Sequence, residues 1–352
     1  MHVLLTTCLV RSGVLTHAWD LVQQLPAYGI EVTVAILQQA DEGGGSEPGS
    51  GREKFSNLLG PISRGRYYFY RTTDDLAAIC QEHKIELLHA HSRLAYPTSQ
   101  VVAKRLGIPL VLTLHGVFPW QKFYPSSLLQ ARAVIAIGPA QAADTELVRE
   151  KVVIIPNGID TQYFCPQPSA PWRQGEELHV IWFGRTNGAS TRGVTVLDRA
   201  IYLLRSRGLK IKATLIGRAA DVYVHEFAAL DWVSDPLPYL QSGHLAFGHG
   251  RSLREAMSCG NVGFLLGHGY GGQVEASWFA GEVPRPVSAI PEYNLPKPEA
   301  EIIAADIARF YHNEKLLEQA RIEARLLALR HFDVREMIRK TIAVYENCLT
   351  PE

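Results

Sequence analysis

The stretch Phe247-Gly-His-Gly-Arg-Ser-Leu-Arg-Glu-Ala-Met-Ser-Cys-Gly260 decides how the rest of this chain is interpreted. The apolar run that ends at Phe247 predicts a buried strand. Ser252 is expected to cap the helix that follows, and Gly260 to end that helix with left-handed backbone. A strand, a glycine loop and a helix N-terminus in this order present backbone N–H groups that attract phosphate.

Two charged side chains belong to the same stretch. Arg251 supplies a cation, and Glu255, one helical turn further on, could accept hydrogen bonds from both hydroxyls of a ribose. The pattern therefore suggests a nucleoside diphosphate site, whose candidate binding residues are Gly248, Gly250, Arg251, Ser252 and Glu255. An ordinary α/β turn with a solvated arginine and glutamate explains the same residues, and this stretch alone leaves both interpretations open.

Composition narrows the class of protein. The chain has 352 residues, enough for two domains, and its 35 Lys and Arg balance 35 Asp and Glu. Its bulk charge gives no reason to expect nucleic acid, whereas a local basic patch leaves peripheral membrane contact open. No apolar run approaches the roughly 20 residues that span a bilayer. Five scattered cysteines without a CxxC pair favour a reduced cytoplasm over disulfides or zinc.

The N-terminal half alternates strand and helix patterns. A strand over Val3–Thr7, a helix starting after Ser12-Gly13 and a strand over Glu31–Leu37 predict a βαβ unit, the usual opening of a doubly wound sheet. Gly13 then lies where such sheets bind ligands, or serves only as a turn residue. Residues 38–52, rich in Gly, Ser, Glu and Pro, predict a mobile loop inside the domain.

Histidines follow two of the predicted strands. His89 and His91 are expected on opposite sides of an extended chain, so a shared metal ion is not expected there. His115, followed by Gly116, is predicted to face the ligand crevice, with a loop histidine as the alternative. The aromatic residues that come next could stack on a sugar or a lipid-linked acceptor, or pack the loop: Phe118, Trp120, Phe123 and Tyr124.

A Pro-rich passage after Pro156 predicts the domain boundary, and a second sheet follows it. The strand His179–Phe183 runs into Gly184-Arg185, and Arg192-Gly193 precedes a helix. Arginine forks match phosphate oxygens. Trp232-Val233 is expected to form a short strand. Gly267–Gly272 has the form GxGxxG but comes too late and lacks a following acid, so it predicts close approach to a ligand and not a dinucleotide fingerprint.

These pieces together resemble the retaining GT-B glycosyltransferases of the large family 4-like group, over essentially the whole chain. The resemblance rests on the order and spacing of these motifs: Ser12-Gly13 with His17, His89-Ala-His91, Thr113-Leu-His115-Gly116, Val153–Asp160, Phe183-Gly-Arg185 with Arg192-Gly193, Glu255–Gly260 and Gly271–Glu275.

The resemblance implies an α/β fold of two Rossmann-like, doubly wound domains facing each other across a cleft. Residues 1–165 would form the acceptor-side domain, rejoined by the helix 333–352, and residues 172–332 the nucleotide-sugar domain. Arg185 and Arg192 would stabilise the departing diphosphate and His115 would contact the donor sugar. Gly13, His17 and Gly116 would lie on the acceptor side, with Gly13 and Gly184 also near the donor.

The implied reaction is transfer of a hexose from a UDP- or GDP-linked donor to a glycan, lipid-linked or small-molecule acceptor. It needs no metal and no further cofactor, and it serves polysaccharide biosynthesis in the cytoplasm or at the inner face of the membrane.

Two departures from the family keep other readings open. Phe247 occupies the position of the first of two donor-site glutamates, eight residues before Glu255, and Arg192 replaces a lysine. A catalytically impaired relative that binds nucleotide or glycan as a partner subunit is therefore the second hypothesis. A nucleotide-sugar epimerase is the third, although no acid/base pair of carboxylates can be assigned to it.

Overall fold

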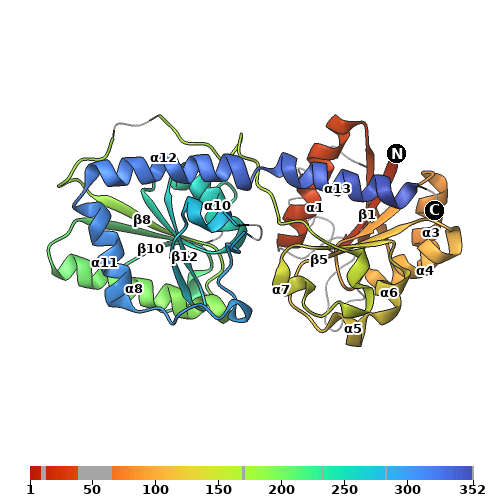
Figure 1. The fold of residues 1–352 in the computed structure, drawn as a ribbon, viewed down its shortest axis with the longest axis horizontal. Coiled ribbons are helices and arrows are strands. Elements are labelled where there is room, and N and C mark those ends of the chain that lie inside the picture. The colour runs from red at the N-terminus through yellow and green to blue at the C-terminus, as the bar shows by residue number, and fades with distance from the viewer. Residues whose placement is uncertain (9–12, 39–65, 169–170, 232, 282–283, 351–352) are drawn as a thin grey trace, which may run out of the picture. The chain divides into compact units, whose positions relative to one another are not determined.

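The computed structural model describes residues 1–352 apart from 9–12, 39–65, 169–170, 232, 282–283 and 351–352 (Figure 1). Ser12, Trp232 and nearly all of the predicted loop 38–52 lie outside the described residues. The chain forms two compact units, each described by itself. The first unit combines Met1–Gly158 with Val334–Glu352, and the second spans Ile159–Asp333.

The first unit is built on a parallel sheet with the strand order β3-β2-β1-β4-β5-β6-β7 among the described residues. Its strands are β1 (His2–Cys8), β2 (Glu31–Leu37), β3 (Arg66–Tyr70), β4 (Leu87–Ala90), β5 (Leu110–Leu114), β6 (Ala133–Ala136) and β7 (Val152–Ile154). Because the chain leaves β1 toward β2 on one side and β4 lies on the other, the order reverses between β1 and β4.

Helices cover both faces of this sheet. They are α1 (Gly13–Gln24), α3 (Thr73–Glu82), α4 (Tyr96–Leu106), α5 (Trp120–Phe123), α6 (Pro125–Gln130), α7 (Pro139–Ala142) and α13 (Val334–Leu349). Apolar residues of α1 and α13 share one core cluster with the strands. Residues of α3, α4 and α6 share the other. The unit is therefore a three-layer α/β/α sandwich.

The second unit repeats this plan with the strand order β10-β9-β8-β11-β12-β13. Its strands are β8 (Leu178–Phe183), β9 (Ile211–Ile216), β10 (Ala228–Leu230), β11 (Leu245–Gly248), β12 (Val262–Leu266) and β13 (Tyr270–Gln273). All described pairings are parallel except β12 with β13, which is antiparallel. The order reverses between β8 and β11.

The helices of the second unit are α8 (Thr191–Ser206), α9 (Leu237–Gln241), α10 (Gly250–Ser258), α11 (Ala300–Tyr311) and α12 (Glu314–His331). Apolar residues of α8 and α11 fill one core. Those of α10 and α12 fill the core on the opposite face. Figure 1 shows α8 and α11 lying together beside this sheet. Since both sheets are doubly wound, the predicted fold class is confirmed.

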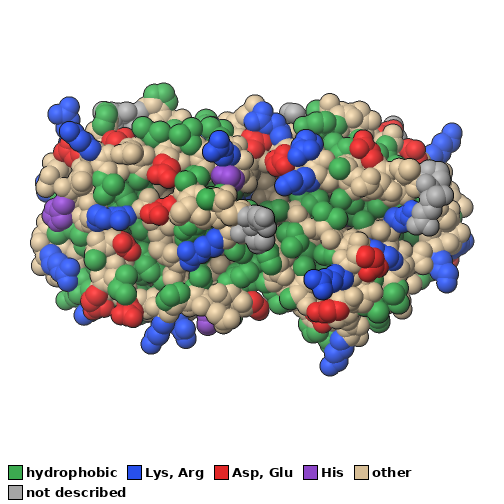
Figure 2. Space-filling model, viewed as in Figure 1, with side chains coloured by type: hydrophobic (Ala, Val, Ile, Leu, Met, Phe, Trp, Pro, Cys, Tyr) green, Lys and Arg blue, Asp and Glu red, His purple; other side chains and the backbone are tan. Residues whose placement is uncertain are grey.

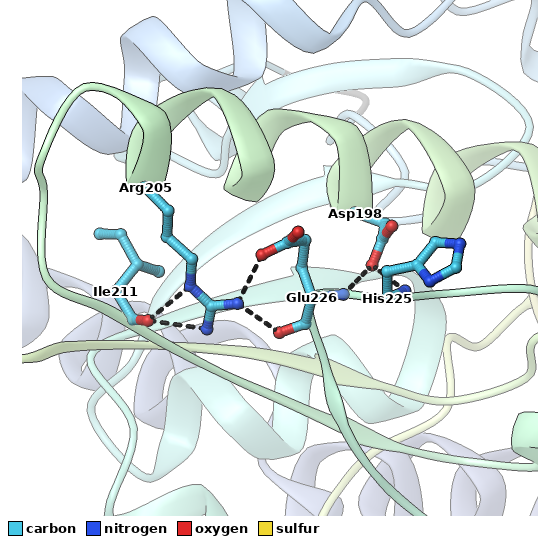
Figure 3. Close-up of polar contacts among 5 residues, drawn as sticks. All are labelled: Asp198, Arg205, Ile211, His225 and Glu226. Atoms are coloured by element: carbon cyan, nitrogen blue, oxygen red, sulfur yellow. Dashed lines mark hydrogen bonds and ion pairs between the residues drawn. The ribbon is translucent and has the colours of Figure 1, made fainter.

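Polar contacts fix α8 to the segment that leads into β10 (Figure 3). The Asp198 carboxylate accepts hydrogen bonds from the backbone N–H groups of His225 and Glu226, at 3.0 and 2.8 Å. The Arg205 guanidinium donates to the Ile211 carbonyl and, at 2.6 Å, to the Glu226 carboxylate. A helix carrying the candidate residue Arg192 at its N-terminal end is thus held at two points further along its length.

The expected strand at Trp232-Val233 includes Trp232, which lies outside the described residues, whereas Val233 is not in a strand and a short strand lies at Ala228–Leu230. The pattern over residues 141–149 predicts one short helix, but the structure has α7 and a separate 3₁₀ segment at Glu146–Lys151. Inside that segment Val148 has non-helical backbone, with φ of −136° and ψ of 28°, and its side chain packs into the core.

Candidate functional site

The first candidate site lies at the carboxyl ends of β8 and β11, where the strand order of the second unit reverses. Open α/β sheets bind ligands at this point. Gly184 and Arg185 follow β8, and His249 with Gly250 follow β11. The sequence motifs that were predicted to bind a diphosphate are therefore neighbours in the sheet of this unit.

Glycines bring these loops close to one another. Gly184 has φ of 137°, and a Cβ built on it would lie 3.4 Å from the Ser252 hydroxyl. A Cβ on Gly193, in the first turn of α8, would lie only 2.7 Å from the Gly267 carbonyl oxygen. The loops after β8 and β12 and the N-terminal turns of α8 and α10 thus converge on one region.

The helix α10 starts earlier than predicted. His249 is its N-cap residue and makes no side-chain cap hydrogen bond, so the expectation that Ser252 caps the helix is wrong. Gly248 and Gly250, with φ of 155° and 67°, let the chain pass from strand to helix around His249 alone. The Gly250 N–H already donates to the Val287 carbonyl at 2.8 Å, so anion binding here depends on the N–H groups that follow.

Arg185 and Arg192 are both exposed, and no hydrogen bond or ion pair of either is found in the described part of the chain. Between them, the Ser190 hydroxyl lies 3.1 Å from His249 Nε2. Burial, followed by the charge of Arg185, lowers the pKa of His249 to about 4. His249 is therefore neutral near pH 7, and the positive charge of this region comes from arginine.

Glu255 occupies the first turns of α10 together with Arg251. The Arg251 guanidinium donates to the Glu255 carboxylate at 2.7 Å, and both side chains are largely buried. The ion pair fixes the Glu255 carboxylate relative to the first turn of the helix. Gly260 ends the helix region with φ of 85°, as predicted.

Phe247, which stands at the position of the family's first donor-site glutamate, lies in the core of the second unit. It is a core residue of β11, 1% exposed, and its ring stacks on Phe264 with centroids 4.7 Å apart. A side chain at this position faces the apolar core and not the loop. The connection between β11 and α10 is the single residue His249, so it contains no carboxylate at all.

The GxGxxG stretch is no dinucleotide fingerprint, because it leads into the antiparallel strand β13 and not into a helix. Cβ atoms on Gly267, Gly269 and Gly271 would meet Ala289, Leu295 and Leu265, all at 3.0 Å or less. Packing against protein is enough to explain these three glycines, and the approach of this stretch to a ligand stays a prediction.

The second candidate site lies in the first unit, at the carboxyl ends of β4 and β5 next to the reversal between β1 and β4. His91 follows β4, His115 follows β5, and His17 belongs to α1. His91 Nδ1 lies 3.3 Å from His115 Nε2, and His17 Nδ1 lies 2.8 Å from the Asn157 side-chain oxygen. The two predicted site histidines, His17 and His115, therefore meet in one cluster with His91.

His89 was expected to point away from His91, and this is wrong. Residues two apart in a strand share a face, and the two rings lie 4.0 Å apart. His89 contacts the Tyr345 hydroxyl and the Thr113 hydroxyl, each at 2.6 Å. Burial, and then the neighbouring histidines, hold the pKa values of His89, His91 and His115 well below 6.5, so these three residues are neutral near pH 7.

Nitrogens of His17, His91 and His115 lie within 4.8 Å of one another. Zinc bonds of about 2.0–2.1 Å place tetrahedral ligand nitrogens about 3.4 Å apart. The 3.3 Å separation of His91 and His115 matches this spacing, whereas the cluster as a whole is looser. Hydrogen bonding accounts for the contacts described, and a metal-free site stays a prediction.

Two predicted site glycines, Gly13 and Gly116, have room beside them among the described residues. A Cβ on either would meet none of the described atoms within 4 Å. In the aromatic segment beyond Gly116, Trp120 is buried and donates to the Gln141 carbonyl, whereas the Phe123 ring is 55% exposed. The segment is thus mainly loop packing, and Phe123 keeps the alternative of ligand contact open.

Comparison with known proteins finds similarity to glycosyltransferases. Residues 11–163 match the family described as Glycosyltransferase Family 4. A glycosyltransferase from Rickettsia africae ESF-5 superimposes with a TM-score of 0.73 at 15% identity, covering 100% of this chain and 99% of that one. Anabaena Alr3699/HepE in complex with UDP-glucose gives 0.69 at 16% identity, covering 98% and 99%. Sucrose-phosphate synthase from Thermosynechococcus elongatus gives 0.59 at 15% identity, covering 98% of each chain.

No curated protein matches the chain. The fold is GT-B, and together with the family match it confirms the resemblance to the GT-B glycosyltransferases that the motifs indicated. None of the described helices is both long and apolar enough to cross a membrane.

Proposed function

We propose that this protein is a glycosyltransferase that moves a hexose from a nucleotide-sugar donor to a glycan, lipid-linked or small-molecule acceptor, with retention and without a metal. One observation carries the proposal. Two exposed arginines without a described partner, Arg185 and Arg192, accompany the N-terminal turns of α8 and α10 at a strand-order reversal. This arrangement offers cations and oriented dipoles to an anion.

The leaving group in such a transfer is a nucleoside diphosphate, which gains negative charge as the glycosidic bond breaks. Arg185 and Arg192, with the N–H groups of Arg251 and Ser252, are proposed to stabilise that charge. Glu255, oriented by Arg251, is proposed to accept the ribose hydroxyls. Preorganised charge of this kind removes the need for a cation bound with the donor.

His115 is proposed to contact the donor sugar, and Gly13, His17 and Gly116 to border the acceptor. HepE was crystallised with UDP-glucose, and TarM from S. aureus with UDP and a glycosylated glycerol. These ligands support a UDP-linked donor here, with GDP as the alternative. On the face drawn in Figure 2, Lys and Arg side chains are interspersed with Asp and Glu, so that face offers no broad cationic surface. We place the protein in the cytoplasm, with peripheral contact at the inner membrane face as an open part of the proposal.

The test compares Arg185→Ala with Arg207→Ala, an exposed arginine at the other end of α8. UDP, GDP and ADP are titrated against each variant, and hydrolysis of UDP-glucose and GDP-mannose is followed. A nucleotide at a hundred times its dissociation constant should stabilise the wild type by about 2.7 kcal/mol, visible as a thermal shift. We expect Arg185→Ala to lose binding and hydrolysis and Arg207→Ala to keep both. Wild-type behaviour of Arg185→Ala would refute the diphosphate assignment.

A second function has its own supporting observation. The connection between β11 and α10 lacks a carboxylate, so the contact that the family makes to the donor sugar there is missing. A nucleotide-binding partner subunit without turnover fits this feature. Tight binding of UDP, combined with no transfer or hydrolysis across a panel of donors and acceptors, would favour the partner subunit over the enzyme.

A further inference from the structure

One hydrogen bond joins the loop that carries the candidate arginines to the start of α10. Ser190 Oγ and His249 Nε2 lie 3.1 Å apart, and the Ser190 side chain is buried. Ser190 belongs to residues 184–193, here called the arginine loop, which includes Arg185 and Arg192. His249 is the single residue between β11 and α10, so the bond links two chain segments that both border the candidate site.

The backbone and the packing of His249 limit the direction of its ring. His249 is extended, with φ of −152°, between Gly248 and Gly250, whose φ values are 155° and 67°. A Cβ built on Gly267 would lie 3.0 Å from His249 Cδ2, so the ring packs against the loop that follows β12. The same Gly267 faces Gly193 through its carbonyl oxygen. His249 therefore contacts the loops that follow β8 and β12.

Two further hydrogen bonds hold the arginine loop, and neither of them reaches α10. The Thr191 hydroxyl donates to the Thr186 carbonyl at 2.9 Å, which closes the loop on itself. The Thr186 hydroxyl donates to the Arg218 carbonyl at 2.6 Å, which fixes the loop to the segment after β9. Of these three contacts, the one between Ser190 and His249 sets the distance between the arginine loop and the first turn of α10.

The two sides of this bond carry the groups that are proposed to bind the diphosphate. Arg185 and Arg192 are exposed and have no partner in the described part of the chain, so the backbone of the loop places their side chains. The N–H groups of Arg251 and Ser252 belong to α10. When the separation of such groups varies, part of the binding free energy is used to order the site.

We propose that His249 is a positioning residue whose hydrogen bond to Ser190 holds the arginine loop against α10, so that cations and helix N–H groups are arranged for a diphosphate before it binds. This inference rests on the proposed function and adds a residue that acts through the arginine loop and not on the ligand. The bond forms with either partner as donor, because a serine hydroxyl and a neutral imidazole nitrogen can each donate or accept.

Hydrogen exchange of the ligand-free protein, measured by mass spectrometry on peptides that cover the arginine loop, tests the positioning directly. Ser190→Ala and His249→Phe each remove the bond, and we expect each to speed exchange of these amides by about 3- to 10-fold. His249→Gln should exchange like the wild type, because its side-chain amide can take the place of Nε2. Wild-type exchange in Ser190→Ala would overturn the inference, whether or not His249→Phe folds.

Calorimetric titration with pyrophosphate tests whether the bond matters for anion binding. We expect Ser190→Ala and His249→Phe each to weaken binding by about 3- to 10-fold, and the double variant to lose no more than the weaker-binding single variant. His249→Gln should bind pyrophosphate like the wild type. Additive losses in the double variant would contradict the proposal, because Ser190 and His249 would then act separately.

Tyr270→Phe is the matched control, because it removes the 2.6 Å hydrogen bond to Asp306, which also belongs to the second unit but does not involve the arginine loop. It should lower the melting temperature and leave exchange in the loop and pyrophosphate affinity as in the wild type. The exchange measurement needs no ligand. A wild-type protein that binds neither UDP nor pyrophosphate would therefore refute the proposed function, while faster exchange in Ser190→Ala would still establish that the bond holds the loop.

Discussion

The Arg251 guanidinium donates to the Glu255 carboxylate across one turn of α10, at 2.7 Å and largely shielded from water. An ion pair at this depth orients the carboxylate. The pair joins Arg251, the predicted phosphate cation, to Glu255, the predicted acceptor of the ribose hydroxyls. Ligands with and without a ribose can therefore test the two roles separately.

Glu255→Gln should weaken UDP binding by about 10- to 100-fold, because a charged acceptor of the ribose hydroxyls is lost. Binding of inorganic pyrophosphate should stay unchanged, since that ligand has no ribose. Calorimetric titration of both ligands, with 2′-deoxy-UDP against the wild type as a control, measures the difference. Equal losses for UDP and pyrophosphate would mean that Glu255 acts only through Arg251.

Gly193→Ala should destabilise the second unit by about 1–3 kcal/mol, because its Cβ would lie 2.7 Å from the Gly267 carbonyl oxygen. Either the first turn of α8 or the loop after β12 must move, so UDP binding should weaken as well. Thermal melting with and without UDP shows both effects. Gly116→Ala, where the added atom meets none of the described atoms within 4 Å, is the stability control and should melt like the wild type.

Phe247→Glu places the family's carboxylate at the position where the sequence pattern expects it, and it should not restore a sugar contact. The side chain would enter the core beside Phe264 and lose at least about 3 kcal/mol of stability. Soluble yield and melting temperature report the cost, with Phe247→Leu as a volume control that folds. A well-folded Phe247→Glu with enhanced donor hydrolysis would show that this position reaches the ligand.

Stability should fall as the pH drops below about 6.5, the ordinary histidine value. Burial lowers the pKa of His179 to about 4, of His244 to about 3 and of His249 to about 4. Below pH 6.5 these histidines are protonated in the unfolded chain but stay neutral in the folded protein. Each of them therefore lowers the free energy of unfolding by about 1.4 kcal/mol per pH unit below 6.5.

Calorimetric melting near pH 7.5, 6.5 and 5.5 tests this, because the midpoint should fall less between the first two values than between the second and the third. Asp75 and Glu336, whose pKa values hydrogen bonds lower, contribute only at lower pH. His179→Gln should reduce the fall of the melting midpoint between pH 6.5 and 5.5, because one buried histidine no longer contributes to it. A midpoint that rises on acidification would contradict the buried neutral histidines.

The fold could be read from local patterns where those patterns are strong. The apolar β-branched run Glu31–Leu37 predicts β2 with the bounds observed, and the helix expected over 333–352 is found as α13 at Val334–Leu349. The strand β13 was not predicted, because its residues Tyr270–Gln273 include two glycines, which have low strand propensity, although it pairs with its sequence neighbour β12.

The candidate site could be read only in part. Glycine loops and arginines marked the region after β8 and β11, because these residue types are unusual at strand ends. The meeting of His17 with His91 and His115 depends on how α1 packs against strands that are far away in sequence. The burial of Phe247 could not be predicted, because a motif aligned by spacing does not show that β11 and α10 are joined by His249 alone.

The helix α13 has a consequence for biosynthesis. It is translated after the entire second unit, yet its Met337, Ile338 and Tyr345 belong to the same apolar cluster as strands made at the very start. During synthesis the second unit, which is continuous in sequence, can therefore fold before the first unit. The first unit keeps exposed hydrophobic surface until α13 is made. Nascent chains stalled before α13 should bind ribosome-associated chaperones, and chains stalled after α13 should bind them less.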